Sequence, residues 1–144
     1  MSALFEHSPW VEARADAQPS SGDRHTDLMA VVHSATREEQ LALIRAHPEL
    51  AGKAAVDLTE ASAAEQASAG LDRLTQNEFD RFHALNAAYR QKFGFPFIIC
   101  VRLTDKAGIL AAMERRLAND RDTEIAAALD QIGEIVRLRL EMII

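Results

Sequence analysis

The chain contains the stretch Lys92-Phe93-Gly94-Phe95-Pro96-Phe97-Ile98-Ile99-Cys100-Val101-Arg102, an apolar run interrupted by a glycine and a proline. Gly94 can adopt backbone angles closed to other residues, and Pro96 fixes its own φ while biasing Phe95 toward an extended conformation. The run therefore predicts a sharp turn followed by extended backbone rather than an ordinary helix. Such a segment could be a buried strand crossing the core or the wall of a pocket.

Helix signals flank this stretch on both sides. Thr75-Gln76-Asn77-Glu78 has the form of a capping box, and the residues after it, including Phe82 and Tyr89, recur at helical spacing up to Gly94, a natural C-terminal glycine. The other expected helices are one starting at Ser8-Pro9-Trp10 and continuing to Ala17, Asp27 to His33, Thr36 to His47, one opening with the capping box Ser62-Ala63-Ala64-Glu65, Asp105 to Leu117, and Thr123 to the end. We therefore expect an all-α fold, a single compact multi-helix domain over residues 1–144.

Length and composition are those of a soluble globular protein. The chain has 144 residues, of which 48% are hydrophobic and 26% charged, enough for one sizeable core. Its longest apolar run, Phe93 to Val101, is far shorter than the roughly 20 residues of a transmembrane helix, and its first residues lack a secretory signal pattern. We expect a cytoplasmic protein without a membrane partner.

Charge and ligand patterns argue against two further classes. A formal net charge of −6, with scattered lysines and arginines, argues against nucleic-acid binding. The five histidines show no ligand spacing and Cys100 is the only cysteine, so no metal site is expected. Cys100 is predicted to be a buried thiol without a catalytic role. The expected partner is a small molecule.

One arginine interrupts the apolar face of the last expected helix. That face is a stripe at alternating steps of three and four residues, formed by Leu129, Ile132, Val136, Arg139 and Ile143, whereas Arg137 lies off it. A buried guanidinium needs a carboxylate, carbonyl groups or a bound anion, because an unpaired charge there is strongly destabilising. Arg139 therefore either binds a ligand, pairs inside the protein, or reaches solvent at the margin of the stripe.

Two further positions combine a structural and a chemical possibility. His47 falls at a helix C-terminus, since Pro48 disfavours helix in the residue before it. The helix dipole there favours the imidazolium, so His47 could transfer protons or simply cap the helix. Glu65 could complete the Ser62 capping box or, with Gln66 beside it, contact a ligand. Spacing alone leaves these alternatives open.

These positions fall inside three blocks that resemble the motifs of one enzyme family. The blocks are His47-Pro48-Glu49-Leu50-Ala51-Gly52-Lys53, Glu65-Gln66-Ala67-Ser68-Ala69-Gly70-Leu71-Asp72 and Phe93-Gly94-Phe95-Pro96-Phe97-Ile98-Ile99-Cys100-Val101-Arg102. In this order they are similar to the signature of OHCU decarboxylase, that is, 2-oxo-4-hydroxy-4-carboxy-5-ureidoimidazoline decarboxylase. The similarity extends from Phe5 to Leu140, nearly the whole chain.

The resemblance implies an all-helical, cofactor-free carboxy-lyase, commonly a homodimer, that performs the last step from urate to (S)-allantoin in purine degradation. By motif position it implies catalytic roles for His47 and Glu65. It implies substrate-binding roles for Pro48, Gln66, Phe97, Ile99 and Arg139. A single site would then account for the unusual positions of the histidine, the glutamate and the arginine.

Two alternatives remain at the level of sequence. A noncatalytic helical dimerisation or ligand-binding module could use the same apolar faces, but it has no reason to retain His47, Glu65 and Arg139 together. A decarboxylase of a related ureido acid would use the same residues, and the sequence does not distinguish it. Nor does the sequence identify the residue that delivers the final proton.

Overall fold

A computed structural model describes residues 4–5, 7–47, 50, 60–71 and 73–143. Within these residues the chain forms seven α-helices, a 3-10 turn and no strand, which confirms the all-α prediction. The elements are α1 (Trp10–Asp16), α2 (Arg24–Ser34), α3 (Arg37–Arg45), α4 (Glu60–Ser68), α5 (Gln76–Phe93), η2 (Val101–Leu103), α6 (Lys106–Arg116) and α7 (Arg121–Ile143).

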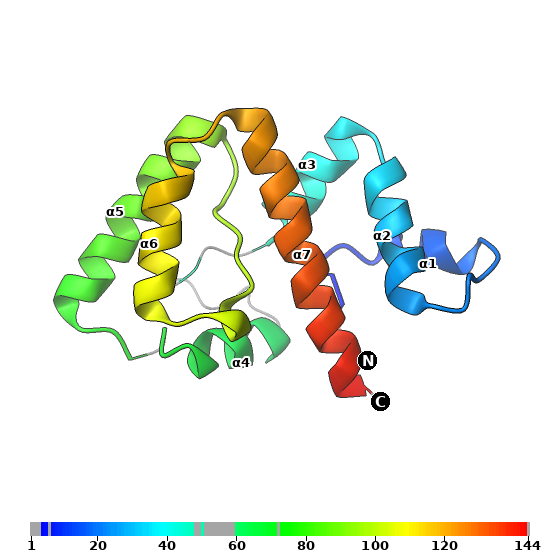
Figure 1. Ribbon diagram of the computed structural model, residues 1–144, viewed down its shortest axis with the longest axis horizontal. Coiled ribbons are helices and arrows are strands. Elements are labelled where there is room, and N and C mark those ends of the chain that lie inside the picture. Colours follow the sequence, from blue (N-terminus) through cyan, green and yellow to red (C-terminus); the bar gives the residue numbers. More distant parts are fainter. Residues whose placement is uncertain (1–3, 6, 48–49, 51–59, 72, 144) are drawn as a thin grey trace.

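The long helix α7 organises the fold. It packs against α2 and α3, and α5 and α6 form a second packed pair, so that α7 runs between the α1–α3 group and the α5–α6 pair (Figure 1). The short helix α4 packs against η2 near the C-terminal half of α7. This arrangement brings α4, η2 and the end of α7 to one edge of the molecule.

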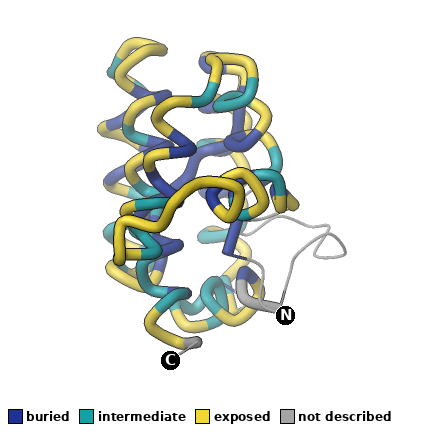
Figure 2. Tube along the Cα trace, turned by 90° about the vertical axis from the view of Figure 1, so that its right-hand side faces the viewer, coloured by how far each residue is buried: buried dark blue, intermediate teal, exposed yellow. Residues whose placement is uncertain are grey.

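The apolar stripe of α7 lies in the core, as its spacing predicts. Leu129, Ile132, Val136 and Arg139 are all buried, and the side chain of Ile143 lies outside the described residues. Helices α1, α2, α3, α5, α6 and α7 contribute to one cluster of buried apolar side chains, with the exposed residues on the outer turns (Figure 2). Arg139 is therefore a cation on a buried helix face.

Local capping signals explain several of the helix ends. Thr36 and Thr75 both form complete capping boxes, with Glu39 and Glu78 as their partners. Gly94 ends α5 in the left-handed conformation, with φ 81°, and its N–H donates to the carbonyl of Arg90. These three features were predicted from the sequence.

One predicted cap is wrong. Helix α4 begins at Glu60, so Ser62 lies inside its first turn and is not the N-cap residue. Its hydroxyl accepts a hydrogen bond from Arg139, and the Glu65 carboxylate also binds Arg139. The capping-box pattern matched by chance, because a serine three residues before a glutamate also places both side chains on one helix face.

The stretch after Gly94 is extended and irregular up to η2, and it is not a strand. Its backbone polar groups bind side chains instead of a neighbouring strand. The N–H of Cys100 donates to Gln131 at 2.9 Å, and the carbonyl of Ile98 accepts from Arg116 at 2.7 Å. Because side chains satisfy these groups, the segment can line a pocket without belonging to a sheet.

Candidate active site

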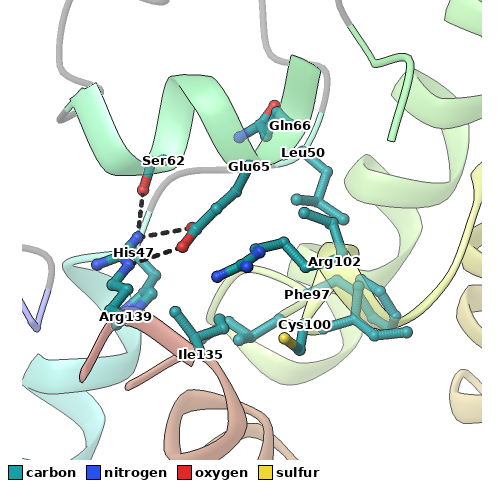
Figure 3. Close-up of a pocket in the computed structure, with 13 residues that line it drawn as sticks. His47, Leu50, Ser62, Glu65, Gln66, Phe97, Cys100, Arg102, Ile135 and Arg139 are labelled. Carbon is teal, nitrogen blue, oxygen red and sulfur yellow. Dashed lines mark hydrogen bonds and ion pairs between the residues drawn. The ribbon is translucent and has the colours of Figure 1, made fainter. Parts of the chain in front are cut away.

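A pocket opens where α4, the segment 97–102 and the C-terminal half of α7 meet (Figure 3). The space between its atoms, counted out into the open mouth, is about 430 Å³. The described residues that line it are His47, Leu50, Ser62, Glu65, Gln66, Phe97, Ile98, Ile99, Cys100, Val101, Arg102, Ile135 and Arg139.

The pocket brings together six of the seven residues that the sequence singled out. They are His47, Glu65, Gln66, Phe97, Ile99 and Arg139. Pro48 lies outside the described residues. Four separate parts of the chain supply these six side chains, so only the tertiary fold could assemble them. Their chemical roles remain predictions.

Glu65 and Arg139 form a two-point ion pair at the pocket. Arg139 Nε donates to Glu65 Oε2 at 2.9 Å, and Arg139 Nη2 donates to Glu65 Oε1 at 2.8 Å. The arginine side chain is only 3% exposed and the glutamate side chain 12%. Bidentate geometry in a poorly hydrated setting fixes both groups in orientation as well as in charge.

Two further oxygens accept hydrogen bonds from the Arg139 guanidinium. Nη2 also donates to the hydroxyl of Ser62 at 3.0 Å, and Nη1 donates to the carbonyl of Leu4 at 3.3 Å. Of the possibilities left open by the sequence, internal pairing is the one observed. The charge of Arg139 is balanced by Glu65 within the protein, and snorkelling is excluded by its burial.

His47 follows the last turn of α3 and is buried, with 6% of its surface exposed. Its Nδ1 lies 3.1 Å from the carbonyl oxygen of Leu43. A carbonyl can only accept, so Nδ1 carries the hydrogen of this bond, and in the neutral ring the basic lone pair is on Nε2. The hydrogen bond thereby sets both the ring orientation and the tautomer.

The opposite side of the pocket is apolar. Phe97, Ile98 and Cys100 are buried there and Ile99 is half-buried, and Ile135, on the same helix as Arg139, is buried too. Burial is the largest cause that raises the pKa of the Cys100 thiol above its usual value, so the thiol stays protonated at neutral pH. This agrees with the prediction that Cys100 has no catalytic role.

A buried polar network supports this wall from behind. The guanidinium of Arg116 lies 4.4 Å from the ring centroid of Phe97 while donating to the Ile98 carbonyl. Glu124 neutralises Arg116 at 2.8 Å and accepts the hydroxyl hydrogen of Tyr89 at 2.6 Å. The polar backbone of the wall is thus held by α6 and α7 on the side away from the pocket.

Some pocket residues were missed by reasoning from the sequence. Ser62 was interpreted as a cap, and Ile135 was not singled out although it lies one turn before Arg139 on α7. Arg102 was quoted as the end of the apolar stretch but given no role. In the structure it belongs to η2 and lines the pocket. The signal that could have found Arg102 is its position directly after the wall residues.

Within the described residues, no group of three or more histidine, cysteine, aspartate or glutamate side chains is arranged to hold a metal ion. None of the described helices is long and apolar enough to cross a membrane.

Comparisons with known proteins identify the family. A family model described as OHCU decarboxylase matches residues 1–141. The chain is 44% identical over 140 residues to 2-oxo-4-hydroxy-4-carboxy-5-ureidoimidazoline decarboxylase of Haloferax volcanii, covering 95% of this chain and 82% of that protein. It is also 44% identical over 141 residues to the protein of the same name from Halalkalicoccus jeotgali, covering 96% of this chain and 79% of that protein.

Solved structures agree on the fold. The chain superposes on a crystal structure of OHCU decarboxylase in the presence of (S)-allantoin with a TM-score of 0.75, at 19% identity, covering 97% of this chain and 94% of that one. Together with the sequence matches, this similarity places the protein among the decarboxylating lyases. The chain belongs to the OHCU decarboxylase family.

Proposed function

We propose that this protein decarboxylates 2-oxo-4-hydroxy-4-carboxy-5-ureidoimidazoline (OHCU) to (S)-allantoin, a step of urate degradation. Membership of the family supports this assignment. The structural observation that carries it is the convergence of the Glu65–Arg139 pair and His47 on one pocket with an apolar wall. A module that only packs against a partner would gain nothing from a buried ion pair that opens onto a cavity.

The reaction itself needs orientation and proton transfer. The bond from the hydroxyl-bearing carbon to the carboxylate breaks as carbon dioxide leaves. Its electron pair forms a double bond to the ureido-bearing carbon, and the π pair of the former carbon–nitrogen double bond moves to the nitrogen. The nitrogen takes up a proton and an enol remains. The enol then loses its hydroxyl proton while the ureido-bearing carbon gains a proton on one face. Because the substrate holds its own electron sink, the protein must supply acid–base groups and a fixed geometry.

His47 is proposed to take the hydroxyl proton of the substrate. Its Nδ1 is committed to the Leu43 carbonyl, which leaves Nε2 as the basic nitrogen of the neutral ring. An imidazole is suited to this step because its ordinary pKa lies near neutral pH, so that it can both accept and return a proton. Its fixed ring orientation makes the transfer specific for one substrate oxygen.

Glu65 is the second proposed catalytic residue. Arg139 holds its carboxylate in a single orientation, so that Glu65 can polarise the substrate hydroxyl or relay a proton without first reorganising. Gln66 offers both a donor and an acceptor, which match the ureido and ring carbonyl groups. Arg139 is proposed to contribute to substrate binding in two ways. It holds Glu65 in position, and its N–H groups can donate to carbonyl oxygens of the substrate.

The apolar wall is proposed to protect the enol. Phe97 and Ile99 belong to the apolar part of the pocket lining. Excluding water prevents protonation of the enol from both faces in solution, a side reaction that would yield racemic allantoin. A dry site therefore favours a single enantiomer.

We also propose that the protein functions as a homodimer in the cytoplasm. The resemblance to the family supports the dimer, and the burial of the sole cysteine as a free thiol is compatible with a reducing compartment. Sedimentation velocity at micromolar concentration tests the first proposal. A species with the mass of one chain across the concentration range would contradict it.

The function is tested with freshly generated substrate. Urate oxidase and 5-hydroxyisourate hydrolase produce OHCU in the cuvette, and circular dichroism follows optically active allantoin. The protein should accelerate formation of the dichroic signal in metal-free buffer, whereas the uncatalysed reaction gives a racemate. Unchanged decay kinetics with a racemic product would refute the proposed function.

A further inference from the structure

The described lining of the pocket contains two guanidinium groups that could bind the carboxylate of the substrate, those of Arg139 and Arg102. Under the proposed function, on which this inference rests, the substrate is an anion. Arg139 is the deepest cation of the pocket, but Glu65 neutralises it through two hydrogen bonds of 2.8 and 2.9 Å. Arg139 also donates to the uncharged oxygens of Ser62 and Leu4. The pair as a unit contributes no net charge toward a bound anion.

Arg102 is the second guanidinium among the described residues of the lining. It is exposed, and its side chain extends across the pocket toward Glu65 (Figure 3). Among the described residues no carboxylate pairs with it. Its Nη1 lies 3.3 Å from the thioether sulfur of Met142 at the end of α7. A thioether is a weak acceptor, so this contact is readily exchanged for a carboxylate.

The backbone places Arg102 at a useful position. It follows directly after the buried wall segment, on η2, and η2 packs against the helix α4 that carries Glu65. The base of its side chain is therefore fixed, while the guanidinium is exposed to solvent at the mouth of the pocket. From there it can contact a group that enters last and faces solvent.

We propose that Arg102 binds the carboxylate of the substrate and so distinguishes the anionic substrate from the neutral product. The interaction exists before the reaction and disappears when carbon dioxide leaves. An interaction made with the ground state and weakened in the transition state lowers KM without raising kcat. Allantoin lacks this carboxylate, so its release does not require breaking the Arg102 contact.

The deciding experiment compares Arg102→Gln with Arg137→Gln. Both substitutions remove one positive charge that is at least partly exposed to solvent, but Arg137 pairs with Glu134 and Glu141 of its own helix α7. Loss of a charge-assisted hydrogen bond should raise KM of Arg102→Gln about tenfold while kcat stays equal or rises, because the lost interaction stabilises the bound substrate more than the transition state. Arg137→Gln should keep the KM of the parent. An unchanged KM in Arg102→Gln would overturn the proposal.

Two further measurements separate carboxylate binding from a structural role. Added salt should raise KM of the parent more than that of Arg102→Gln, because salt screens the attraction between Arg102 and the substrate carboxylate, which the variant lacks. Met142→Leu removes the thioether acceptor but keeps the guanidinium, and it should retain the KM of the parent. If Met142→Leu reproduced the effect of Arg102→Gln, the arginine would act by positioning α7, and the proposal would fail.

The product provides the last comparison. Inhibition by (S)-allantoin should be equal in the parent and in Arg102→Gln, since the neutral product lacks the group recognised. A parallel loss of allantoin affinity would contradict the assignment. Failure of this inference is distinguishable from failure of the proposed function, because in the first case the parent still forms dichroic allantoin rapidly, and in the second it does not.

Discussion

Both carboxylate oxygens of Glu65 are held by the guanidinium of Arg139, which lies 74 positions later in the chain. This ion pair connects α4 to the last helix and forms one side of the pocket. Each partner is the main countercharge of the other in a poorly hydrated place. Removing one alone therefore leaves a buried charge, whereas removing both does not.

The first prediction follows from this coupling. Glu65→Gln and Arg139→Met should each destabilise the fold, in the direction of the about 3 to 5 kcal/mol typical for breaking a buried pair, because each leaves the partner's charge without its countercharge. The double variant should be more stable than the sum of the single effects. Urea unfolding of all four proteins measures the coupling. Simple additivity would contradict the dominance of the pair.

Arg139 cannot be replaced by another cation without loss. Arg139→Lys keeps the charge, but an ammonium cannot bind both Glu65 oxygens while also reaching Ser62 and the Leu4 carbonyl. Turnover should fall at least about tenfold, on the scale of a lost charge-assisted hydrogen bond. The matched variant Arg137→Lys should have nearly parental activity, since Arg137 makes exposed pairs worth about 0.5 kcal/mol or less. Equal effects at both positions would exclude a special role for Arg139.

His47→Asn tests the proposed proton transfer. The asparagine amide can still donate toward the Leu43 carbonyl in place of Nδ1, but no group replaces Nε2. We expect a loss of turnover on the order of 10²-fold or more, the range for removal of a general acid–base group. Because His47 is buried, a small decrease of Tm is also expected. A folded variant with near-parental kcat would assign the histidine to helix capping alone.

Tyr89 is the only tyrosine of the chain and gives a clean spectroscopic signal. Burial, followed by its hydrogen bond to Glu124, raises the pKa of the Tyr89 phenol well above its usual value near 10. A raised pKa in the folded state means that this contribution to stability is complete below pH about 10 and is lost as pH rises further. The tyrosinate absorbance at 295 nm should therefore appear together with loss of helical dichroism. Ionisation near pH 10 in a folded protein would contradict the burial.

The ion pair between Arg14 on α1 and Glu39 on α3 should make the stability of the fold depend on pH in acid. Hydrogen bonds from Arg14, followed by that from the Thr36 backbone, lower the pKa of the Glu39 carboxyl from 4.5 to about 2. The corresponding stability is present above pH 4.5 and is lost as pH falls toward 2. In Arg14→Gln, carboxyl NMR should show a higher pKa for Glu39 that still lies below 4.5, since the Thr36 capping box remains. An unchanged titration would mean that Arg14 has no influence in solution.

Much of the fold could be predicted because its signals are local. The capping boxes at Thr36 and Thr75 and the glycine cap at Gly94 depend on a few neighbouring residues, and the structure has all three. The same kind of pattern wrongly predicted a helix cap at Ser62, because the Ser62 hydroxyl and the Glu65 carboxylate bind Arg139 instead. A local motif does not reveal a stronger distant partner.

The sequence by itself determined the helical class, the approximate helix ends, the position of Arg139 within the apolar stripe of the last helix and the family, because these follow from periodicity, backbone preferences and ordered motifs. Only the tertiary structure decided that Glu65 neutralises Arg139, that Arg116 holds the pocket wall from behind, and that Arg102 faces the pocket. The physical reason is the range of the interactions. Helix formation depends on contacts three or four residues apart, whereas charge compensation depends on which distant side chains the packed helices bring within hydrogen-bonding distance.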